Sequence, residues 1–250
     1  MTTNHGSTKR PDSQLVKCKY CENVVVEPVT ICDRLYCRQL QGRENLAASI
    51  EADYAGWMHN LNVPTRFIGI ELKSFPGNIV KRIMDIAWSE SLFLYGPTGT
   101  TKTSLGFAAA MEWIKRVPPK LINPDKPFYG MKGIWQRVRS CDMMREVKRC
   151  YRSARDDSDA VIHHYENIPM LTIDDIFGGH METEHDEAML TAVLDARYEW
   201  CRPTIVTSNL SVADVRAMDS RLASRLGGYV KFRMSGEDRR EYERHGKVKV

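Results

Sequence analysis

The chain has 250 residues, of which 42% are hydrophobic and 27% are charged, and its net charge is +4. These values fit one sizeable globular domain with a small module, and the charge is too low to indicate nucleic-acid binding by itself. No apolar run approaches the ~18 residues of a membrane span and the first 14 residues are polar, so we expect a cytoplasmic protein without a membrane partner. In that reducing setting the seven cysteines are expected to be metal ligands or free thiols.

Residues 1–14 carry no apolar periodicity, and we expect a disordered lead. Four cysteines follow, spaced C-x2-C and C-x4-C around a short β-like run: Cys18, Cys21, Cys32 and Cys37. Two close thiolate pairs can supply four tetrahedral ligands to one zinc ion, which would also supply folding energy to so short a segment. The sequence therefore predicts a zinc-binding module within residues 15–60. Because C-x4-C is looser than the usual pair, His5 remains an alternative ligand.

Three elements are expected between the cysteines and the next motif. Residues 38–60 have a helical pattern with an irregular apolar face, and residues 67–70 form a short extended piece. Residues 79–90 are predicted to form an amphipathic helix.

A strand, a glycine loop and a helix then follow one another in the sequence SLFLYGPTGTTKTS. This is the layout of a phosphate-binding loop, in which backbone N–H groups cradle the phosphates and the helix N-terminus adds a partial positive charge. Lys102 would reach the terminal phosphates, and Thr103 would bind Mg²⁺. The predicted ATP-binding residues are Gly96, Pro97, Thr98, Gly99, Thr100, Thr101, Lys102, Thr103 and Ser104.

One position departs from the pattern G-x-x-x-x-G-K-[ST]. The residue directly before Lys102 is Thr101, where the pattern has glycine. A side chain there would crowd the phosphates or hold the backbone in a strained conformation that costs ~1–3 kcal/mol.

Residues 134–139 are the next predicted strand, and Asp142 is expected to cap a helix that runs to about Ala154. Residues 145–155 contain five basic residues and one acid. Such a stripe is a solvated helix face or a contact surface for a phosphate backbone. The candidate contacts to a phosphate backbone are Arg145, Lys148, Arg149 and Arg152.

Residues 169–175 form an apolar run that ends in Asp174 and Asp175, the pattern of a Walker B strand. Asp174 would hold Mg²⁺, and Asp175 would polarise the attacking water. Glutamate is more common at the second position, so the shorter Asp175 either acts on a slightly shifted water or makes hydrolysis slow.

Residues 204–209 are predicted to be a strand that ends in Asn209, which would orient the attacking water or be an ordinary turn residue. Arg221 and Arg225 lie four residues apart on one helix face. Either they are surface arginines, or one reaches a neighbouring subunit's nucleotide as an arginine finger.

Taken in order, LFLYGPTGTTKTS, RVRSCDMMREVK, MLTIDDIFG, LTAVLDARYEWCRPTIVTSNL and SRLASRLGG resemble the AAA+ ATPases of the DnaC and DnaI helicase-loader group and the related IstB ATPases. The resemblance covers about Val63 to Arg240. It implies an α/β fold with a five-stranded parallel sheet, an AAA+ ATPase domain over residues 61–250, and ATP-dependent oligomers with nucleotide between neighbours. Only 25 residues follow Arg225, which predicts that there is no helical lid domain.

The resemblance also assigns roles. It makes Asn209 the sensor and Arg225 the arginine finger with Arg221 as its companion. The leading hypothesis is an ATP-dependent loader that binds the replicative helicase through its N-terminal module and single-stranded DNA through its core. The alternatives are an IstB-like transposition ATPase and a non-hydrolysing adaptor with a degenerate nucleotide site. Thr101 and Asp175 keep the adaptor hypothesis open.

Overall fold

A computed structural model describes residues 15–26, 29–122, 133–151, 158–178 and 184–236. Its centre is a five-stranded sheet of order β4-β5-β6-β3-β7, in which every neighbouring pair is parallel. The strands are β3 (Leu92–Tyr95), β4 (Trp135–Arg139), β5 (Met170–Ile176), β6 (Thr204–Ser208) and β7 (Val230–Arg233). The predicted α/β fold with a five-stranded parallel sheet is confirmed.

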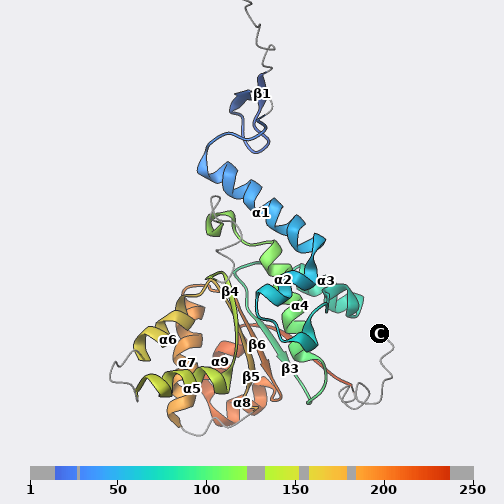
Figure 1. Cartoon of the computed structure of the whole chain (residues 1–250). Coiled ribbons are helices and arrows are strands. Elements are labelled where there is room, and N and C mark those ends of the chain that lie inside the picture. Colours follow the sequence, from blue (N-terminus) through green and yellow to red (C-terminus); the bar gives the residue numbers. More distant parts are fainter. Residues whose placement is uncertain (1–14, 27–28, 123–132, 152–157, 179–183, 237–250) are drawn as a thin grey trace, which may run out of the picture.

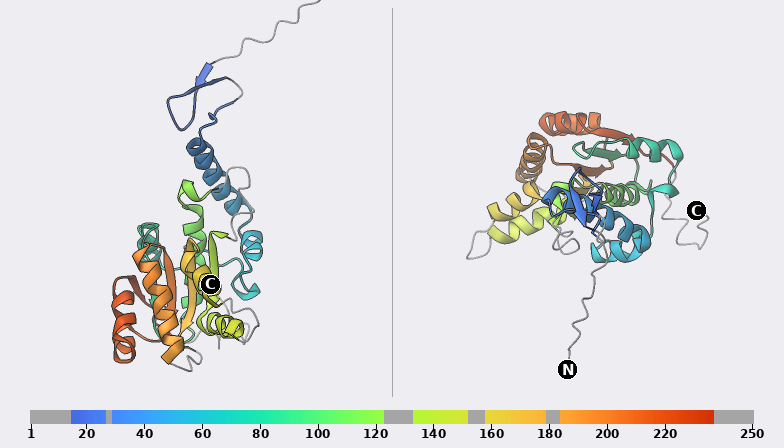
Figure 2. Two further views of the ribbon diagram at one scale, coloured as in Figure 1. Left: turned by 90° about the vertical axis from the view of Figure 1, so that its left-hand side faces the viewer. Right: turned by 90° about the horizontal axis from the view of Figure 1, so that it is seen from above.

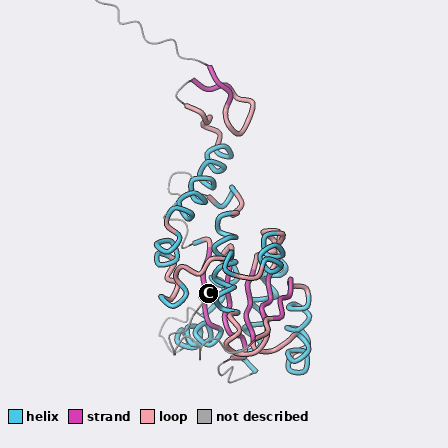
Figure 3. The backbone as a smooth tube through the Cα atoms, turned by 90° about the vertical axis from the view of Figure 1, so that its right-hand side faces the viewer, coloured by secondary structure: helices cyan, strands magenta, loops and turns pink. Residues whose placement is uncertain are grey.

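Helices cover both faces of this sheet (Figures 1 and 3). On one face lie α1 (Leu35–Ala52), α2 (Tyr54–Asn60), α3 (Gly77–Met84) and α4 (Lys102–Lys115). The short 3₁₀ turns η1 (Thr65–Phe67) and η2 (Leu72–Ser74) lie between α2 and α3, and η3 (Pro119–Leu121) follows α4. On the other lie α5 (Ser140–Tyr151), α6 (Ser158–Asn167), α7 (Glu184–Glu199), α8 (Val212–Met218) and α9 (Ser220–Gly227). None of the helices in these ranges is long and apolar enough to cross a membrane.

Each strand supplies side chains to two separate cores, because successive residues of a strand point to opposite faces. Leu92 and Leu94 pack in the core under α4, whereas Phe93 packs in the core under α5 and α7. The same alternation places Trp135 with α4 and Val138 with α5. Arg137, two residues after Trp135, therefore lies on the α4 face, where its guanidinium is 5.8 Å from the ring of Phe107.

The N-terminal module is a hairpin of β1 (Leu15–Lys17) and β2 (Val24–Val26) at the start of α1. It projects beyond the sheet, and the far end of α1 reaches the core (Figure 2). Leu46 and Ile50 of α1 are fully buried in the α4-side core. Near the hairpin, Glu44 of α1 accepts hydrogen bonds from Lys19 and from the hydroxyl of Tyr20. These bonds attach the cysteine loop to the helix.

Four local expectations need correction. The helix predicted over residues 38–60 is two helices, because the carboxylate of Asp53 accepts the N–H of Gly56 and caps a new helix. Residues 67–70 are not one extended piece, since Phe67 closes a 3₁₀ turn and Gly69 has φ 84°. The helix predicted over 79–90 spans Gly77–Met84. Asp142 lies inside the first turn of α5, where it pairs with arginines and is not the N-cap.

The predicted lead of residues 1–14, including His5, lies outside the described residues, as does Arg152.

Candidate functional site

A cleft of about 400 Å³ opens at the carboxyl ends of β3 to β6. It brings together the predicted phosphate loop, the two acids of β5 and the asparagine after β6. The lining residues are Arg66, Phe67, Thr98, Gly99, Thr100, Thr101, Lys102, Thr103, Ser104, Arg137, Arg139, Asp174, Asp175, Gly178, Thr207 and Asn209. In a parallel α/β sheet this edge is where ligands bind, because the loops after successive strands converge there.

The glycines of the loop are required by backbone geometry. Gly96 has φ 139°, and a Cβ there would lie 2.0 Å from the carbonyl oxygen of Met234. Gly99 has φ 79°, a left-handed conformation that glycine adopts without steric cost. The loop after β3 therefore makes its first turn only because these two positions have no side chain.

Thr101 is also left-handed, with φ 65° and ψ 18° at the N-cap of α4. A β-branched residue is an outlier in this region. Its hydroxyl does not cap the helix and donates to the neighbouring carbonyl of Thr100 at 2.6 Å. Strained backbone at Thr101, predicted from the missing glycine, is thus observed.

Lys102 is folded back onto its own loop. Its ammonium donates to the carbonyl oxygens of Gly96 at 2.7 Å and Pro97 at 2.6 Å, and only 7% of the residue is exposed. The hydroxyl of Thr103 donates to Asp174 Oδ1 at 2.9 Å, 71 residues further along the chain. A cation, a hydroxyl and a carboxylate thus meet at one end of the loop, a donor set suited to phosphate and Mg²⁺.

Asp174 is buried, with 4% exposure, and both of its carboxylate oxygens are occupied. Oδ1 accepts the hydroxyls of Thr103 at 2.9 Å and Thr207 at 2.7 Å. Oδ2 forms an ion pair with Arg137 of β4. A buried carboxylate needs such partners, because an unpaired charge away from water is costly.

Asp175 points to the same cleft with φ 61°. Its N–H donates to the hydroxyl of Thr207 at 2.8 Å, and its carboxylate accepts from Asn209 Nδ2 at 3.3 Å. Aspartate tolerates the left-handed region better than most residues, which gives a physical reason for the shorter acid here. The structure thus places the predicted pair of acids and Asn209 together.

Arg66, Phe67, Arg137, Arg139 and Thr207 line the cleft but were not predicted as site residues. Arg137 and Arg139 carried a usable signal, since they alternate at the carboxyl end of a strand and so share one face. Nothing in the local sequence places Arg66 and Phe67 near the loop. Packing does, because the ring of Phe67 lies 5.0 Å from that of Phe107 in α4.

The predicted arginine finger and its companion are not in the cleft of their own chain. Arg225 pairs with Asp195 Oδ1 of α7 at 2.5 Å, and Arg221 pairs with Oδ2 of the same carboxylate. Arg225 also lies 4.9 Å from the ring of Tyr198, and hydrogen bonding to Asp195 raises its pKa. Both arginines are thus held on the surface of α7 and α9.

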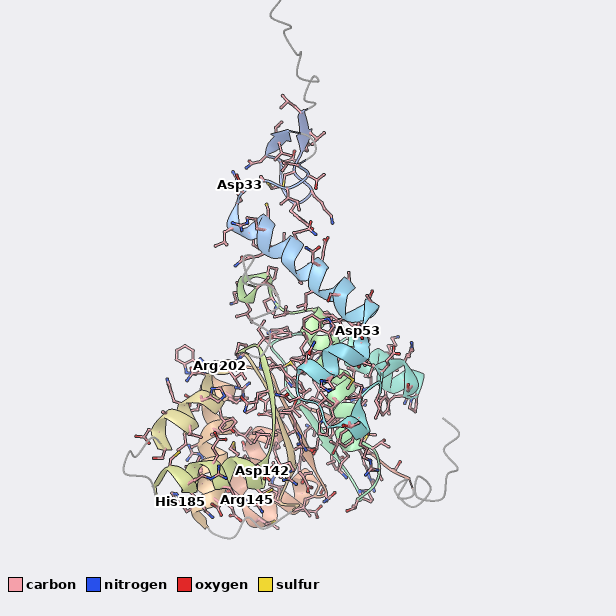
Figure 4. All side chains as sticks on the ribbon, viewed as in Figure 1. Asp33, Asp53, Asp142, Arg145, His185 and Arg202 are labelled. Carbon is pink, nitrogen blue, oxygen red and sulfur yellow. The ribbon has the colours of Figure 1, made fainter. Side chains whose placement is uncertain are left out.

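The predicted DNA-binding residues differ in their surroundings. Arg145 is exposed and pairs with Asp142 at 3.0 Å. Both residues are labelled on α5 in Figure 4. Arg149 is exposed. Lys148, in contrast, forms a 2.8 Å ion pair with the buried carboxylate of Asp186, which ties α5 to α7.

The four cysteines of the module converge, and their sulfur atoms all lie within 4.8 Å of one another. Cys18 and Cys21 come from the hairpin loop, while Cys32 precedes α1 and Cys37 lies in its first turns. The N–H of Cys32 donates to the sulfur of Cys18 at 3.3 Å, which lowers the pKa of Cys18 to about 6. Burial raises the pKa of Cys37 to about 12. Four thiols in this arrangement could hold one tetrahedral metal ion.

No protein-family model and no curated protein sequence matches the chain. Solved structures do match. A DnaI structure superposes with a TM-score of 0.52 at 19% identity, covering 70% of this chain and 93% of its own. A DnaC helicase loader gives 0.50 at 18%, covering 68% and 99%.

A replication initiator DnaA bound to AMPPCP and single-stranded DNA gives a TM-score of 0.51 at 18% identity, and covers 67% of this chain. The present chain spans 50% of that DnaA. The chain thus shares its fold with these loader and initiator structures. The resemblance predicted from the order of motifs is confirmed at the level of fold.

Proposed function

We propose that this protein is an ATP-dependent loader of a replicative helicase that acts on single-stranded DNA. The observation that carries the proposal is the cleft, where Lys102 and Thr103 of the loop meet Asp174, Asp175 and Asn209. These side chains have the residue types and order needed for phosphoryl transfer. The compact DnaI and DnaC structures, which the chain matches over nearly their full length, support a loader over a larger initiator.

Each group in the cleft has a role in hydrolysis under this proposal. Backbone N–H groups of Thr98 to Ser104 bind the phosphates, and Lys102 turns from its loop carbonyls to the terminal phosphates. The hydroxyl of Thr103 and the carboxylate of Asp174 are oxygen ligands of the kind that Mg²⁺ prefers, and Mg²⁺ bound there would neutralise phosphate charge. Asp175, held by Asn209, polarises the attacking water.

Under this proposal, a second subunit supplies a further positive charge for hydrolysis. Arg225 is the proposed finger and Arg221 its companion, because both lie outside their own chain's cleft on an exposed helix. Their shared partner Asp195 keeps them oriented in the single chain. We therefore propose a homo-oligomer in which nucleotide lies between neighbours.

The N-terminal module is the proposed docking site for the helicase, folded around a zinc ion bound by its four cysteines. Among the residues of the module that the structure describes, five large hydrophobic ones are more than half exposed: Leu15, Val24, Val29, Leu35 and Tyr36. Exposed apolar side chains gathered on one small module indicate a protein-binding surface. Single-stranded DNA is proposed to contact the exposed Arg145 and Arg149 of α5, together with Arg152.

ATP turnover with and without single-stranded DNA tests the activity. Turnover stimulated by DNA is expected, whereas no turnover with intact helicase binding would favour the non-hydrolysing adaptor. Capture of a replicative helicase on the immobilised full chain tests the partner. Tyr36→Ser and Leu15→Ser should abolish capture, and Met84→Ser, an exposed apolar residue of α3, is the matched control. No capture by the wild-type chain would favour the IstB-like alternative, whereas unchanged capture by all three variants would mean that the helicase docks elsewhere on the chain. Point substitutions are preferred to a deletion, because α1 is part of the core.

A further inference from the structure

The ion pair between Arg137 and Asp174 occupies the acid that is proposed to hold Mg²⁺. Only 5% of the Asp174 side chain and 21% of the Arg137 side chain are exposed. Charges in such a setting interact strongly, because little water is present to screen them. In the chain alone, the guanidinium is thus the counter-ion of the buried carboxylate.

Two arginines of β4 are candidates to pair with Asp174, and the fold decides which of them does. In the register of β4 and β5, the residue directly opposite Asp174 is Arg139 and not Arg137. Arg139, however, turns away and forms two bonds with Asp142, at 2.6 Å and 3.0 Å. Arg137 reaches diagonally along the sheet to Asp174 from a position over the ring of Phe107.

The pair does not satisfy the arginine completely. Among the described residues, Arg137 Nε is buried and has no hydrogen-bond partner. A buried donor without a partner carries a free-energy cost, so a second position of the guanidinium in which Nε has an acceptor would remove that cost. Arg137 lines the same cleft as the phosphate loop, where phosphate oxygens would accept its N–H groups.

We propose that Arg137 competes with Mg²⁺ for the carboxylate of Asp174 in the nucleotide-free protein. It thereby sets the Mg²⁺ concentration at which the cleft binds nucleotide. This inference rests on the proposed ATP site. A guanidinium and a divalent cation repel each other at one carboxylate, so Arg137 leaves Asp174 when Mg²⁺ arrives. It then contacts the phosphates that arrive with the ion, which couples uptake of the metal to uptake of the nucleotide.

The test is a titration of Mg²⁺ in the presence of a fluorescent ATP analogue, with nucleotide binding read by anisotropy. Arg137→Gln removes the competing cation, so the Mg²⁺ midpoint, measured at a saturating concentration of the analogue, should fall about tenfold, which corresponds to about 1.4 kcal/mol. The phosphate contacts of Arg137 are lost as well, which should lower the affinity for the analogue at saturating Mg²⁺. In the same variant without nucleotide, Mg²⁺ alone should raise the melting temperature, since Asp174 then has no ion-pair partner. The wild-type chain should show a smaller rise.

Arg139→Gln is the matched control, because it removes a positive charge from the same strand face and cleft without touching Asp174. It should weaken binding at all Mg²⁺ concentrations and leave the midpoint in place. An unchanged or raised midpoint in Arg137→Gln, or an equal fall in both variants, overturns the inference. If Arg137→Gln does not fold, Arg137→Lys is used. Its single ammonium pairs less well than the planar fork, so its midpoint should also fall, and an unchanged midpoint again overturns the inference.

The proposed function fails in a different way. If the wild-type chain binds no ATP analogue at any Mg²⁺ concentration, the ATP site itself is wrong. If the wild type binds in the presence of Mg²⁺ but the variants share its midpoint, only the role of Arg137 is wrong.

Discussion

Thr101→Gly is expected to stabilise the protein. Thr101 has φ 65° at the N-cap of α4, where a non-glycine residue costs roughly 1–2 kcal/mol. Glycine gains backbone freedom in the unfolded chain, which offsets about 0.5–1 kcal/mol. The hydroxyl bond to Thr100 is lost, but it joins adjacent residues and does not cap the helix. The net gain is about 1 kcal/mol, a rise of about 2–4 °C in melting temperature for a chain of this size.

The assay is urea unfolding followed by circular dichroism, with Thr101→Ala as the matched variant. Alanine also lacks the hydroxyl but keeps the Cβ, so it retains most of the strain. Thr101→Gly should therefore be the more stable of the two by about 1 kcal/mol. A glycine variant that is less stable than the alanine variant would refute the reasoning.

The same substitution should also tighten binding of an ATP analogue, because the threonine side chain lies on the loop that is proposed to cradle the phosphates. Equilibrium binding measures this effect separately from stability. An unchanged or weaker affinity would mean that the loop accommodates Thr101 without crowding the phosphates.

Three further outcomes are expected. Purified protein should contain about one zinc ion per chain, lost together with the fold of the module in Cys18→Ser, and metal analysis of a well-folded, metal-free chain would contradict this. Gly96→Ala should destabilise the fold by about 2–3 kcal/mol in urea unfolding, because its Cβ would meet a backbone oxygen at 2.0 Å, while Gly77→Ala, with open space around it, should change little. Arg225→Ala should lower ATP turnover at least ~10³-fold, and mixing it with Lys102→Ala subunits should restore part of the activity; no recovery would argue against a finger acting between subunits.

The motifs could be read from the sequence because each is a local pattern. A glycine loop, an apolar strand ending in acids and two pairs of cysteines are recognisable within a few contiguous residues. Their order predicted the α/β fold, and parallel strands bring their carboxyl ends to one edge. Hence Lys102 and Asp174 were expected in one site, and the structure has them there.

Conformation at single residues was only partly predictable. The missing glycine indicated strain at Thr101, and its left-handed backbone bears this out. At Asp175 the sequence showed only a shorter acid than usual. Its positive φ became visible only in the turn after β5, where it accounts for the choice of aspartate.

Partners that lie far apart in the chain were decided by the tertiary structure alone. Asp195 gave no signal in the sequence, yet packing of α7 against α9 makes it the shared partner of Arg221 and Arg225. Likewise, Lys148 is part of a basic stripe in the sequence, but in the fold it forms an ion pair with buried Asp186. The pattern of charge along a helix does not state what packs against it.

The sequence by itself therefore determined which groups are available for nucleotide chemistry and the order along the chain of the strands that carry them. Only the tertiary structure decided that Arg137, and not Arg139, pairs with Asp174. The physical reason is that register and side-chain direction between β4 and β5 depend on packing across the sheet, where Phe107 supports one arginine and Asp142 holds the other.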